Sequence, residues 1–185
     1  MTTAGVVLAA GEGRRFEGPT HKLRAPFRGR CLAAWALEAA AAAGLDELIV
    51  VTGAVDLDDL IPAGATVVRN ENWADGQAGS LRGAVFLAES RGHDAVVVGL
   101  ADQPLVPAEA WRAVGASSSP IAIADFDGDR RPPTRLAKEV WSLLPVSGDE
   151  GARRVLRARP DLVEAIPCSG SPVDIDTVED LRIWS

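Results

Sequence analysis

The segment from Val6 to Lys22 has the residue types and the spacing of a phosphate-binding loop. An apolar run ends in Gly11–Gly13, and the cationic residues Arg14, Arg15 and Lys22 follow. Glycine lets the backbone turn tightly and brings its N–H groups close to a ligand. Successive N–H groups can form a concave anion site, beside which arginine and lysine add full charges. These residues therefore predict a strand followed by a loop that binds a phosphate group.

This loop matches neither of two common nucleotide-binding motifs. The P-loop requires Gly-Lys-Ser/Thr at the start of a helix, whereas Lys22 stands between His21 and Leu23. The dinucleotide-binding fingerprint ends in glycine or alanine where this chain has Phe16. The ligand of the loop must therefore be inferred from the rest of the chain.

Carboxylates at two other places could hold a metal ion. Asp102 comes directly after a strongly apolar run, where an unpaired charge is costly to bury. Mg²⁺ takes one or two protein carboxylates together with substrate phosphates, so Asp102 is a candidate ligand; the alternative is that it caps the next helix. Asp174 and Asp176 share one side of an extended segment, and either could complete the site. Asp176 could also cap the last helix.

Apolar runs that alternate with helical segments predict a mainly parallel sheet with helices on both faces. The predicted strands are Gly5–Ala9, Glu47–Val51, Thr66–Arg69, Ala95–Leu100, Pro120–Ala124 and Val163–Ile166, with a polar turn at Asp125–Arg131 and a short return strand at Thr134–Leu136. The predicted helices are Leu32–Ala43, Asp56–Leu60, Ser80–Glu89, Pro107–Val114, Lys138–Leu144, Asp149–Ala158 and Thr177–Trp184. We therefore expect an α/β three-layer sandwich formed by a single domain, residues 1–185.

Parallel sheets bind ligands at the carboxyl ends of their strands. Four candidate features fall at such ends: Gly11–Arg15, the pair Thr52 and Gly53, Asn70, and Asp102. We therefore expect these residues to meet at one edge of the sheet.

Composition excludes several classes of protein. The net charge of −7 argues against general nucleic-acid binding. Cys31 and Cys168 are too few for a disulfide framework. No apolar run approaches the ~20 residues that a membrane span needs, and no signal-peptide pattern is seen. We expect a cytoplasmic protein that binds neither nucleic acid nor membrane.

Other notable residues have simpler interpretations. His21 and His93 do not have zinc-ligand spacing with the cysteines. The arginines between Arg153 and Arg159 are interpreted as a solvated helix face. Four tryptophans in predicted helices are interpreted as core residues, namely Trp35, Trp111, Trp141 and Trp184. Trp73 lies in a polar loop and remains a candidate for function.

Five motifs in this order resemble the MobA-like nucleotidyltransferases, and in particular their molybdenum cofactor cytidylyltransferase branch. They are Leu8-Ala9-Ala10-Gly11 with Arg14-Arg15-Phe16, Gly18 and Lys22; Asn72-Trp73 with Gly76 and Gly79-Ser80-Leu81-Arg82; Asp102-Gln103-Pro104-Leu105; Gly148-Asp149 with Gly151-Ala152-Arg153; and Asp174-Ile175-Asp176-Thr177 with Glu179-Asp180-Leu181. The motifs extend over nearly the whole chain.

The resemblance implies a Rossmann-like nucleotidyltransferase fold and transfer of a nucleotidyl group from a nucleoside triphosphate to a phosphorylated acceptor. It implies that Arg15 and the backbone of Gly11–Gly13 hold the triphosphate tail and that Lys22 neutralises charge at the α-phosphate. Asp102 with Asp176, or with Asp174, would hold Mg²⁺. The implied nucleotide-binding set is Leu8, Ala9, Ala10, Gly11, Glu12, Gly13, Arg14, Thr52, Gly53, Asn70, Gly79 and Ser80, with Arg15, Lys22 and Asp102 as the catalytic residues.

The resemblance favours CTP as the donor and molybdopterin as the acceptor, because Leu-Ala-Ala-Gly and Asp-Gln-Pro are typical of the CTP-using branch. A molybdoenzyme or its chaperone would receive the product. The segment Arg130–Thr134 and Ala101 depart from the motifs of that branch. Two alternatives therefore stay open: a transferase of the same fold that uses GTP or another phosphorylated acceptor, such as a sugar phosphate or a phospho-acid, and a non-catalytic nucleotide- or cofactor-binding protein.

Overall fold

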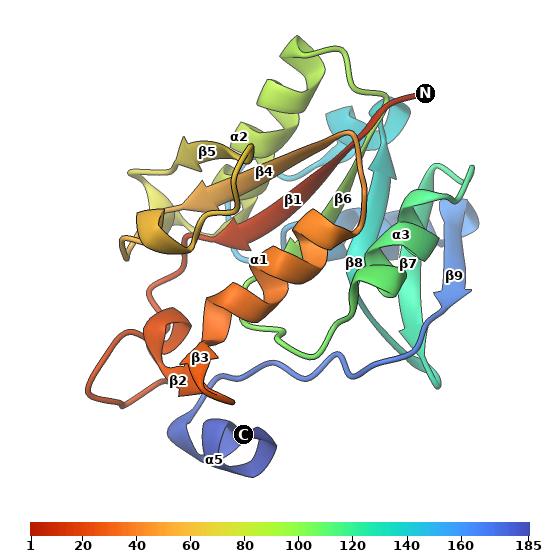
Figure 1. Cartoon of the computed structure of the whole chain (residues 1–185). Helices are drawn as coiled ribbons and strands as arrows, with labels where there is room; N and C mark the ends of the chain where they lie inside the picture. The colour runs from red at the N-terminus through yellow and green to blue at the C-terminus, as the bar shows by residue number, and fades with distance from the viewer.

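A seven-stranded sheet runs through the middle of the molecule (Figure 1). The computed structural model describes residues 1–185. The strands lie in the order β5-β4-β1-β6-β8-β7-β9. Their bounds are β1 Thr3–Ala9, β4 Glu47–Thr52, β5 Thr66–Arg69, β6 Ala95–Leu100, β7 Ile121–Phe126, β8 Asp129–Ala137 and β9 Val163–Pro167. The expected α/β architecture with a mainly parallel sheet is confirmed.

One strand, β8, runs antiparallel to both of its neighbours, β6 and β7. It begins at Asp129, so it is longer than the predicted return strand, and the predicted polar turn shrinks to Asp127 and Gly128. Both turn residues have positive φ, 54° and 95°, a conformation that aspartate tolerates and glycine favours. The polar residues from Asp129 to Arg131 pair with β7 instead of forming a loop. Propensity alone misses this strand because tertiary pairing stabilises it.

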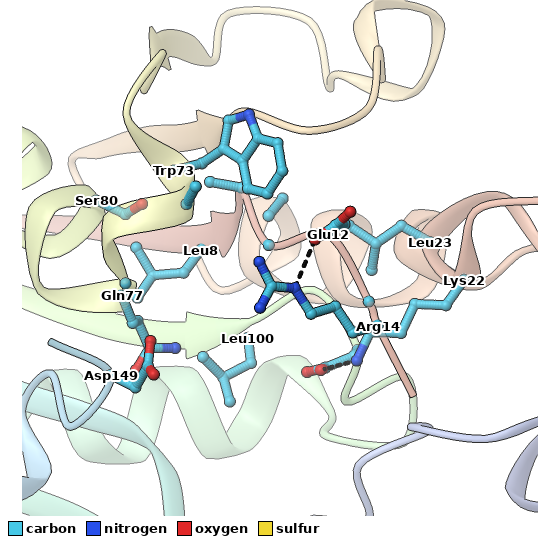
Figure 2. Close-up of a pocket in the computed structure, with 17 residues that line it drawn as sticks. Leu8, Glu12, Arg14, Lys22, Leu23, Trp73, Gln77, Ser80, Leu100 and Asp149 are labelled. Atoms are coloured by element: carbon cyan, nitrogen blue, oxygen red, sulfur yellow. Dashed lines mark hydrogen bonds and ion pairs between the residues drawn. The ribbon is translucent and has the colours of Figure 1, made fainter. Parts of the chain in front are cut away.

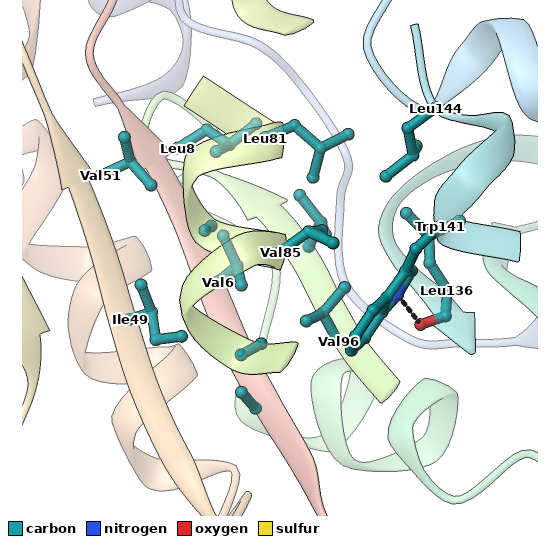
Figure 3. Close-up of a cluster of buried hydrophobic side chains, with 14 of the residues drawn as sticks. Val6, Leu8, Ile49, Val51, Leu81, Val85, Val96, Leu136, Trp141 and Leu144 are labelled. Carbon is teal, nitrogen blue, oxygen red and sulfur yellow. Dashed lines mark hydrogen bonds between the residues drawn. The ribbon is translucent and has the colours of Figure 1, made fainter. Parts of the chain in front are cut away.

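Two layers of helices cover the sheet and make it a sandwich. On one face α1 (Leu32–Ala42) and α3 (Ala108–Gly115) pack on β1, β4, β6 and β7. On the other face, α2 (Gln77–Ser90) and the 3₁₀ segment η4 (Lys138–Leu143) contribute most of the helical core residues. Figure 3 shows this second core, in which the Trp141 indole N–H donates to the Leu136 carbonyl oxygen at 3.0 Å. Because both faces are covered, every residue of β1 is buried.

The remaining helical segments are short. They are η1 Lys22–Arg24, η2 Asp58–Leu60, η3 Trp73–Asp75, α4 Arg153–Ala158, η5 Pro160–Leu162 and α5 Val178–Trp184. The predicted helix Asp149–Ala158 begins only at Arg153, because Gly148 and Gly151 adopt positive φ values of 96° and 50° that interrupt a helix. The prediction over Lys138–Leu144 was likewise wrong in kind, since this segment is 3₁₀.

A small third core attaches the C-terminal segment to the body of the molecule. The hairpin of β2 (Pro26–Phe27) and β3 (Arg30–Cys31), which was not predicted, packs with α1 and the C-terminal segment. The buried residues of this core are Phe27, Leu32 and Ile175. Figure 1 shows α5 beside the hairpin, at the C-terminus.

The C-terminal helix α5 tests two predictions, its N-terminal cap and the burial of Trp184. Thr177, not Asp176, caps α5, through a reciprocal capping box with Asp180. Trp184 is 36% exposed, so its prediction as a core residue was wrong. Trp111 and Trp141 are buried as expected.

No helix has the length and apolarity that crossing a membrane requires.

Candidate active site

Two adjoining cavities open at the edge of the sheet where β1, β4 and β6 end. The first cavity, about 320 Å³, lies over the loop that follows β1 (Figure 2). The second cavity, about 700 Å³, lies between that loop, β8 and α4. Five residues line both cavities: Leu8, Gln77, Leu100, Asp102 and Asp149. The two cavities are therefore halves of one site, and Asp102 stands at their boundary.

The glycine loop forms the floor of the first cavity. Gly13 has φ +70°, and a Cβ atom added there would lie 3.1 Å from Cγ of Lys22. The loop can therefore lie directly against the Lys22 side chain only because residue 13 is glycine. A Cβ added at Gly11 would meet nothing within 4 Å, so the space above that residue is free for a ligand.

His21 stabilises this loop, a function that the sequence did not reveal. Its Nδ1 accepts a hydrogen bond from the Leu23 backbone N–H at 3.2 Å, so the proton of the neutral ring is on Nε2. That Nε2 lies 3.1 Å from the Gly11 carbonyl oxygen and donates to it. Burial lowers the pKa of His21, which favours this neutral form.

Most of the predicted nucleotide-binding residues line the first cavity. They are Leu8, Ala9, Ala10, Gly11, Glu12, Gly13, Arg14 and Ser80. Figure 2 shows Arg14 paired with Glu12 and, across the cavity, Gln77 beside Asp149. Arg15, which was predicted beside the triphosphate tail, lines the second cavity instead.

Four of the predicted residues, Thr52, Gly53, Asn70 and Gly79, do not line either cavity. Three of them, Thr52, Gly53 and Asn70, lie behind the wall of the first cavity and support it. Asn70 donates to the Ser80 hydroxyl at 2.9 Å, and its backbone N–H donates to the Thr52 carbonyl oxygen at 2.8 Å. A Cβ added at Gly53 would lie 2.7 Å from the Ala10 carbonyl oxygen and 2.9 Å from Cβ of Trp73, so only glycine fits there. These contacts position Ser80 and Trp73, both of which line the cavity.

Lys22 joins two of the predicted metal-binding carboxylates. Its Nζ lies 2.7 Å from Oδ2 of Asp102 and 2.8 Å from Oδ1 of Asp176, and its side chain is only 11% exposed. Burial alone would lower the pKa of Lys22, but the charges and hydrogen bonds of the two aspartates raise it. Arg15 binds the other oxygen of Asp176 at 2.7 Å. The site therefore brings Asp102 and Asp176 together around a charged lysine.

Asp174 lies on the second-cavity side of this group. Its carboxylate accepts from Gln103 Nε2 at 2.9 Å and pairs with Arg131 at 3.2 Å. Burial and the charge of Asp102 raise the pKa of Asp174, although Arg131 and Gln103 oppose the shift. Asp174 and Asp176 both line the second cavity, on the same side of the chain as predicted.

The donor set at Asp102 fits a divalent cation. Oδ1 of Asp102 is buried and has no hydrogen-bond partner, which is costly unless a positive group approaches it. No three His, Cys, Asp or Glu side chains converge as a metal site. A hard cation bound here would therefore take one or two carboxylates and complete its shell with phosphate and water oxygens, as Mg²⁺ does.

The second cavity combines cationic and apolar walls. Its arginines are Arg15, Arg130, Arg131, Arg153 and Arg157. Its apolar lining includes Leu81, Val98, Ile123, Leu156 and Val163. Four aspartates, Asp102, Asp149, Asp174 and Asp176, line the same cavity, so its charge is mixed and the arginines are the groups that could bind an anionic ligand.

Two of these arginines belong to the helix face that was predicted to be solvated. Arg153 and Arg157 are exposed, as expected of a solvated helix face, but they also line the second cavity. The signal was their spacing: residues four apart share one face of a helix. Arg154 lines neither cavity, so the periodicity separates it from its neighbours.

Asp149 and Gln77 also had no predicted function. They come together because the loop before α4 packs on the start of α2. The Ala78 N–H donates to the Gly148 carbonyl oxygen at 2.9 Å, and a Cβ added at Gly76 would lie 2.6 Å from that oxygen. This contact joins the walls of the two cavities.

Comparison with known proteins shows the family of the chain. Residues 5–163 match the MobA-like NTP transferase domain. The chain is 31% identical to nicotine blue oxidoreductase of Paenarthrobacter nicotinovorans, over 96% of this chain and 93% of that protein. It is also 31% identical to the purine catabolism protein PucB of Bacillus subtilis (strain 168), over 95% of this chain and 92% of that protein.

A solved structure has a similar fold over the whole chain. Rv0371c of Mycobacterium tuberculosis H37Rv superposes with a TM-score of 0.81 at 29% identity, covering 100% of this chain and 97% of that one. A second structure of that protein, in complex with manganese, gives a TM-score of 0.77 at 28% identity and covers 100% and 98%.

The family model spans most of the chain, and the two relatives match it over nearly the whole length of both proteins. The family supports nucleotidyl transfer and the use of a divalent metal. As its motifs predicted, the chain belongs to the MobA-like NTP transferase family.

Proposed function

We propose that this protein transfers CMP from CTP to the phosphate group of molybdopterin or its molybdenum cofactor, with release of pyrophosphate. The observation that carries the proposal is the pair of cavities that meet at Asp102. The first has a glycine loop suited to a triphosphate, and the second has arginines suited to an anionic acceptor. Their boundary is where the α-phosphate and the attacking phosphate would meet.

The first cavity would hold the nucleotide. The backbone N–H groups of Gly11–Gly13 and the guanidinium of Arg14 would bind the triphosphate tail. In this proposal Arg14 would take the function expected of Arg15, because Arg14 lines the first cavity and Arg15 lines the second. Ser80 and Trp73, supported by Asn70, Gly53 and Thr52, would contact the nucleoside.

The reaction needs electrostatic stabilisation more than proton transfer. A phosphate monoester has its second pKa near ~6, so the acceptor is already a dianion at neutral pH and needs no general base. Charge that develops on the α-phosphate and on the departing pyrophosphate would be stabilised by Lys22 and by the loop N–H groups. Asp102 with Asp176 would hold Mg²⁺, which supplies further neutralisation of the phosphate oxygens when bound.

The second cavity would hold the acceptor. Arginine binds phosphate oxygens through paired N–H groups, and five arginines line this cavity. The apolar residues Leu81, Ile123 and Leu156 would contact an uncharged ring system. Molybdopterin combines these two chemical features in one molecule.

The nearest competing function is nucleotidyl transfer to a different acceptor, such as a sugar phosphate or a phospho-acid, or with GTP as the donor. It is favoured by Arg130 and Arg131, which depart from the expected motif and line the second cavity. The similarity to a protein named as an oxidoreductase raises a further activity to test. A non-catalytic binding protein is less consistent with the phosphate loop and carboxylates, which are both present.

The test is a panel of acceptors with CTP and Mg²⁺, scored by pyrophosphate release. Molybdopterin should give release, whereas sugar 1-phosphates and phospho-acids should give little. Release with one of those acceptors and none with molybdopterin would favour the competing transferase. NAD(P)H-dependent reduction of a dye without pyrophosphate release would instead indicate an oxidoreductase.

A further inference from the structure

The carboxylates that would bind a metal are already neutralised by two side chains of the protein. Lys22 Nζ binds Oδ2 of Asp102 at 2.7 Å and Oδ1 of Asp176 at 2.8 Å. Arg15 binds Oδ2 of Asp176 at 2.7 Å. Of the four carboxylate oxygens, only Oδ1 of Asp102 has no partner, and it is buried. A cation that arrives alone would therefore find one free oxygen.

The charges lead to the same conclusion. Two negative carboxylates face two positive side chains, so this group has no net charge. A divalent cation added without an anion would leave the group with two excess positive charges at close range, which is unfavourable in a partly buried site. Either a cationic side chain must leave or an anionic ligand must arrive.

Lys22 is the side chain that can leave without losing its contact with the site. Its side chain lies against Gly13, where an added Cβ would be 3.1 Å from its Cγ, and it lines the first cavity. A small rotation of its flexible stem could move Nζ from the carboxylates to a phosphate held by the loop. Arg15 is 74% exposed and lines the second cavity, not the first, where the triphosphate would lie.

We propose that Lys22 is a resident counter-ion that a divalent cation must displace from Asp102 and Asp176, so that tight metal binding requires the triphosphate that accepts the displaced Lys22. The inference rests on the proposed function for its use of a metal and a triphosphate, but not on the base or the acceptor. Metal and nucleotide then bind cooperatively, because each removes the charge that opposes the other.

The first experiment measures Mn²⁺ binding in the absence of nucleotide, by the electron paramagnetic resonance signal of free Mn²⁺. Lys22→Met keeps the apolar stem and removes the charge, and it should bind Mn²⁺ at least about tenfold more tightly than the wild type. Lys138→Met is the matched control, because Lys138 is the only other lysine and pairs with Glu89 on the surface. Its Mn²⁺ affinity should equal that of the wild type.

A second experiment uses the wild-type protein and does not depend on a variant that folds. An amine-reactive acylating reagent should modify Lys22 much more slowly than Lys138, since Lys22 is 11% exposed and doubly paired. Saturating Mn²⁺ should raise the rate at Lys22 several-fold and leave Lys138 unchanged. Mass spectrometry of tryptic peptides separates the two sites.

Thermal unfolding tests the cooperativity with inorganic triphosphate, which has no base. Mn²⁺ and inorganic triphosphate together should raise Tm by more than the sum of their separate effects in the wild type. The proposal is overturned if Lys22→Met binds Mn²⁺ no more tightly than the wild type, or if Mn²⁺ fails to increase acylation of Lys22. Since neither result involves CTP or molybdopterin, a wrong donor or acceptor would leave both tests intact.

Discussion

The backbone N–H of Ile175 donates a hydrogen bond to the carbonyl oxygen of Asp102 at 3.0 Å, which ties the C-terminal segment to the end of β6. The Ile175 side chain is fully buried in the third core with Phe27 and Leu32. Its neighbours Asp174 and Asp176 line the second cavity. Ile175 therefore positions both aspartates, although it does not itself contact the cavity.

Truncating this anchor should affect activity as well as stability. Ile175→Ala should lower the free energy of unfolding by about 2–5 kcal/mol, because it leaves a cavity in a small core. It should also lower kcat for pyrophosphate release under conditions where the variant is fully folded, since Asp176 is no longer held in place. Ile183→Ala is the control: Ile183 is 64% exposed, so both quantities should stay near wild type. A stability loss with unchanged kcat would contradict the positioning function.

Replacing glycine by alanine should have different effects at Gly11 and at Gly53, on ligand binding at the first and on stability at the second. Gly11→Ala should leave stability unchanged, because the added Cβ meets nothing, but it should weaken triphosphate binding by filling the ligand space. Gly53→Ala should destabilise the fold by about 1–3 kcal/mol, because the Cβ would overlap the Ala10 carbonyl and Trp73. Urea unfolding and nucleotide titration measure the two effects. Equal destabilisation by both would contradict the assigned geometry of the loop.

The arginines of α4 predict a specific effect on the acceptor. Arg153→Gln should raise KM for the acceptor about tenfold or more, as expected for a lost charge-assisted hydrogen bond, and leave KM for the nucleotide unchanged. Arg154→Gln removes the same charge from the adjacent residue, which lines neither cavity, and should change neither value. If both variants behave alike, the second cavity is not the acceptor site.

Glu47, far from the site at the start of β4, predicts a pH dependence of stability. Although burial opposes the shift, hydrogen bonds from His93 and Thr66 and the charge of Arg91 hold the pKa of Glu47 below its ordinary value of 4.5. A carboxyl group with a lowered pKa in the folded state stabilises the protein above its unfolded-state pKa. That contribution is lost as pH falls through the folded-state value.

Glu47→Gln should therefore cost about 1–3 kcal/mol at pH 7, and its difference from the wild type should shrink as pH falls below about 4.5. Glu109→Gln is the control, because Glu109 is exposed. Chemical denaturation at several pH values gives the free energies. A difference that stays constant as the pH falls from 7 to about 3 would show that the ionised form of Glu47 is not stabilised by these contacts.

Strands that are buried along nearly their whole length could be predicted from the sequence. The apolar runs of β1 and β6 are buried on both sides, and such runs are recognisable without tertiary information. The sequence did not predict the hairpin Pro26–Cys31, because its two-residue strands are too short to show a pattern and Phe27 packs against the distant Ile175. It also did not predict the full length of β8, because the polar residues Asp129–Arg131 are stabilised by pairing with β7 and not by their own propensity.

The same distinction applies to the site. Asp102 and Lys22 could be recognised from the sequence, because a charged side chain next to a buried strand or a glycine loop is costly unless it binds an opposite charge. The boundary between Thr52 or Asn70, which support the wall, and Ser80, which lines it, depends on which side chain faces the cavity. The spacing of Arg153 and Arg157 places them on one face of a helix, but which face of α4 borders the cavity depends on how α4 packs.

A labelled nucleotidyl group measures CMP transfer to molybdopterin most directly. Purified protein is incubated with molybdopterin, Mg²⁺ and either α-³²P-CTP or α-³²P-GTP, and the label in the dinucleotide product is counted. The proposal predicts label transfer from CTP, none without molybdopterin, and a loss of at least about a hundredfold with Asp102→Asn. Transfer from GTP with none from CTP, or full activity of Asp102→Asn, would contradict it.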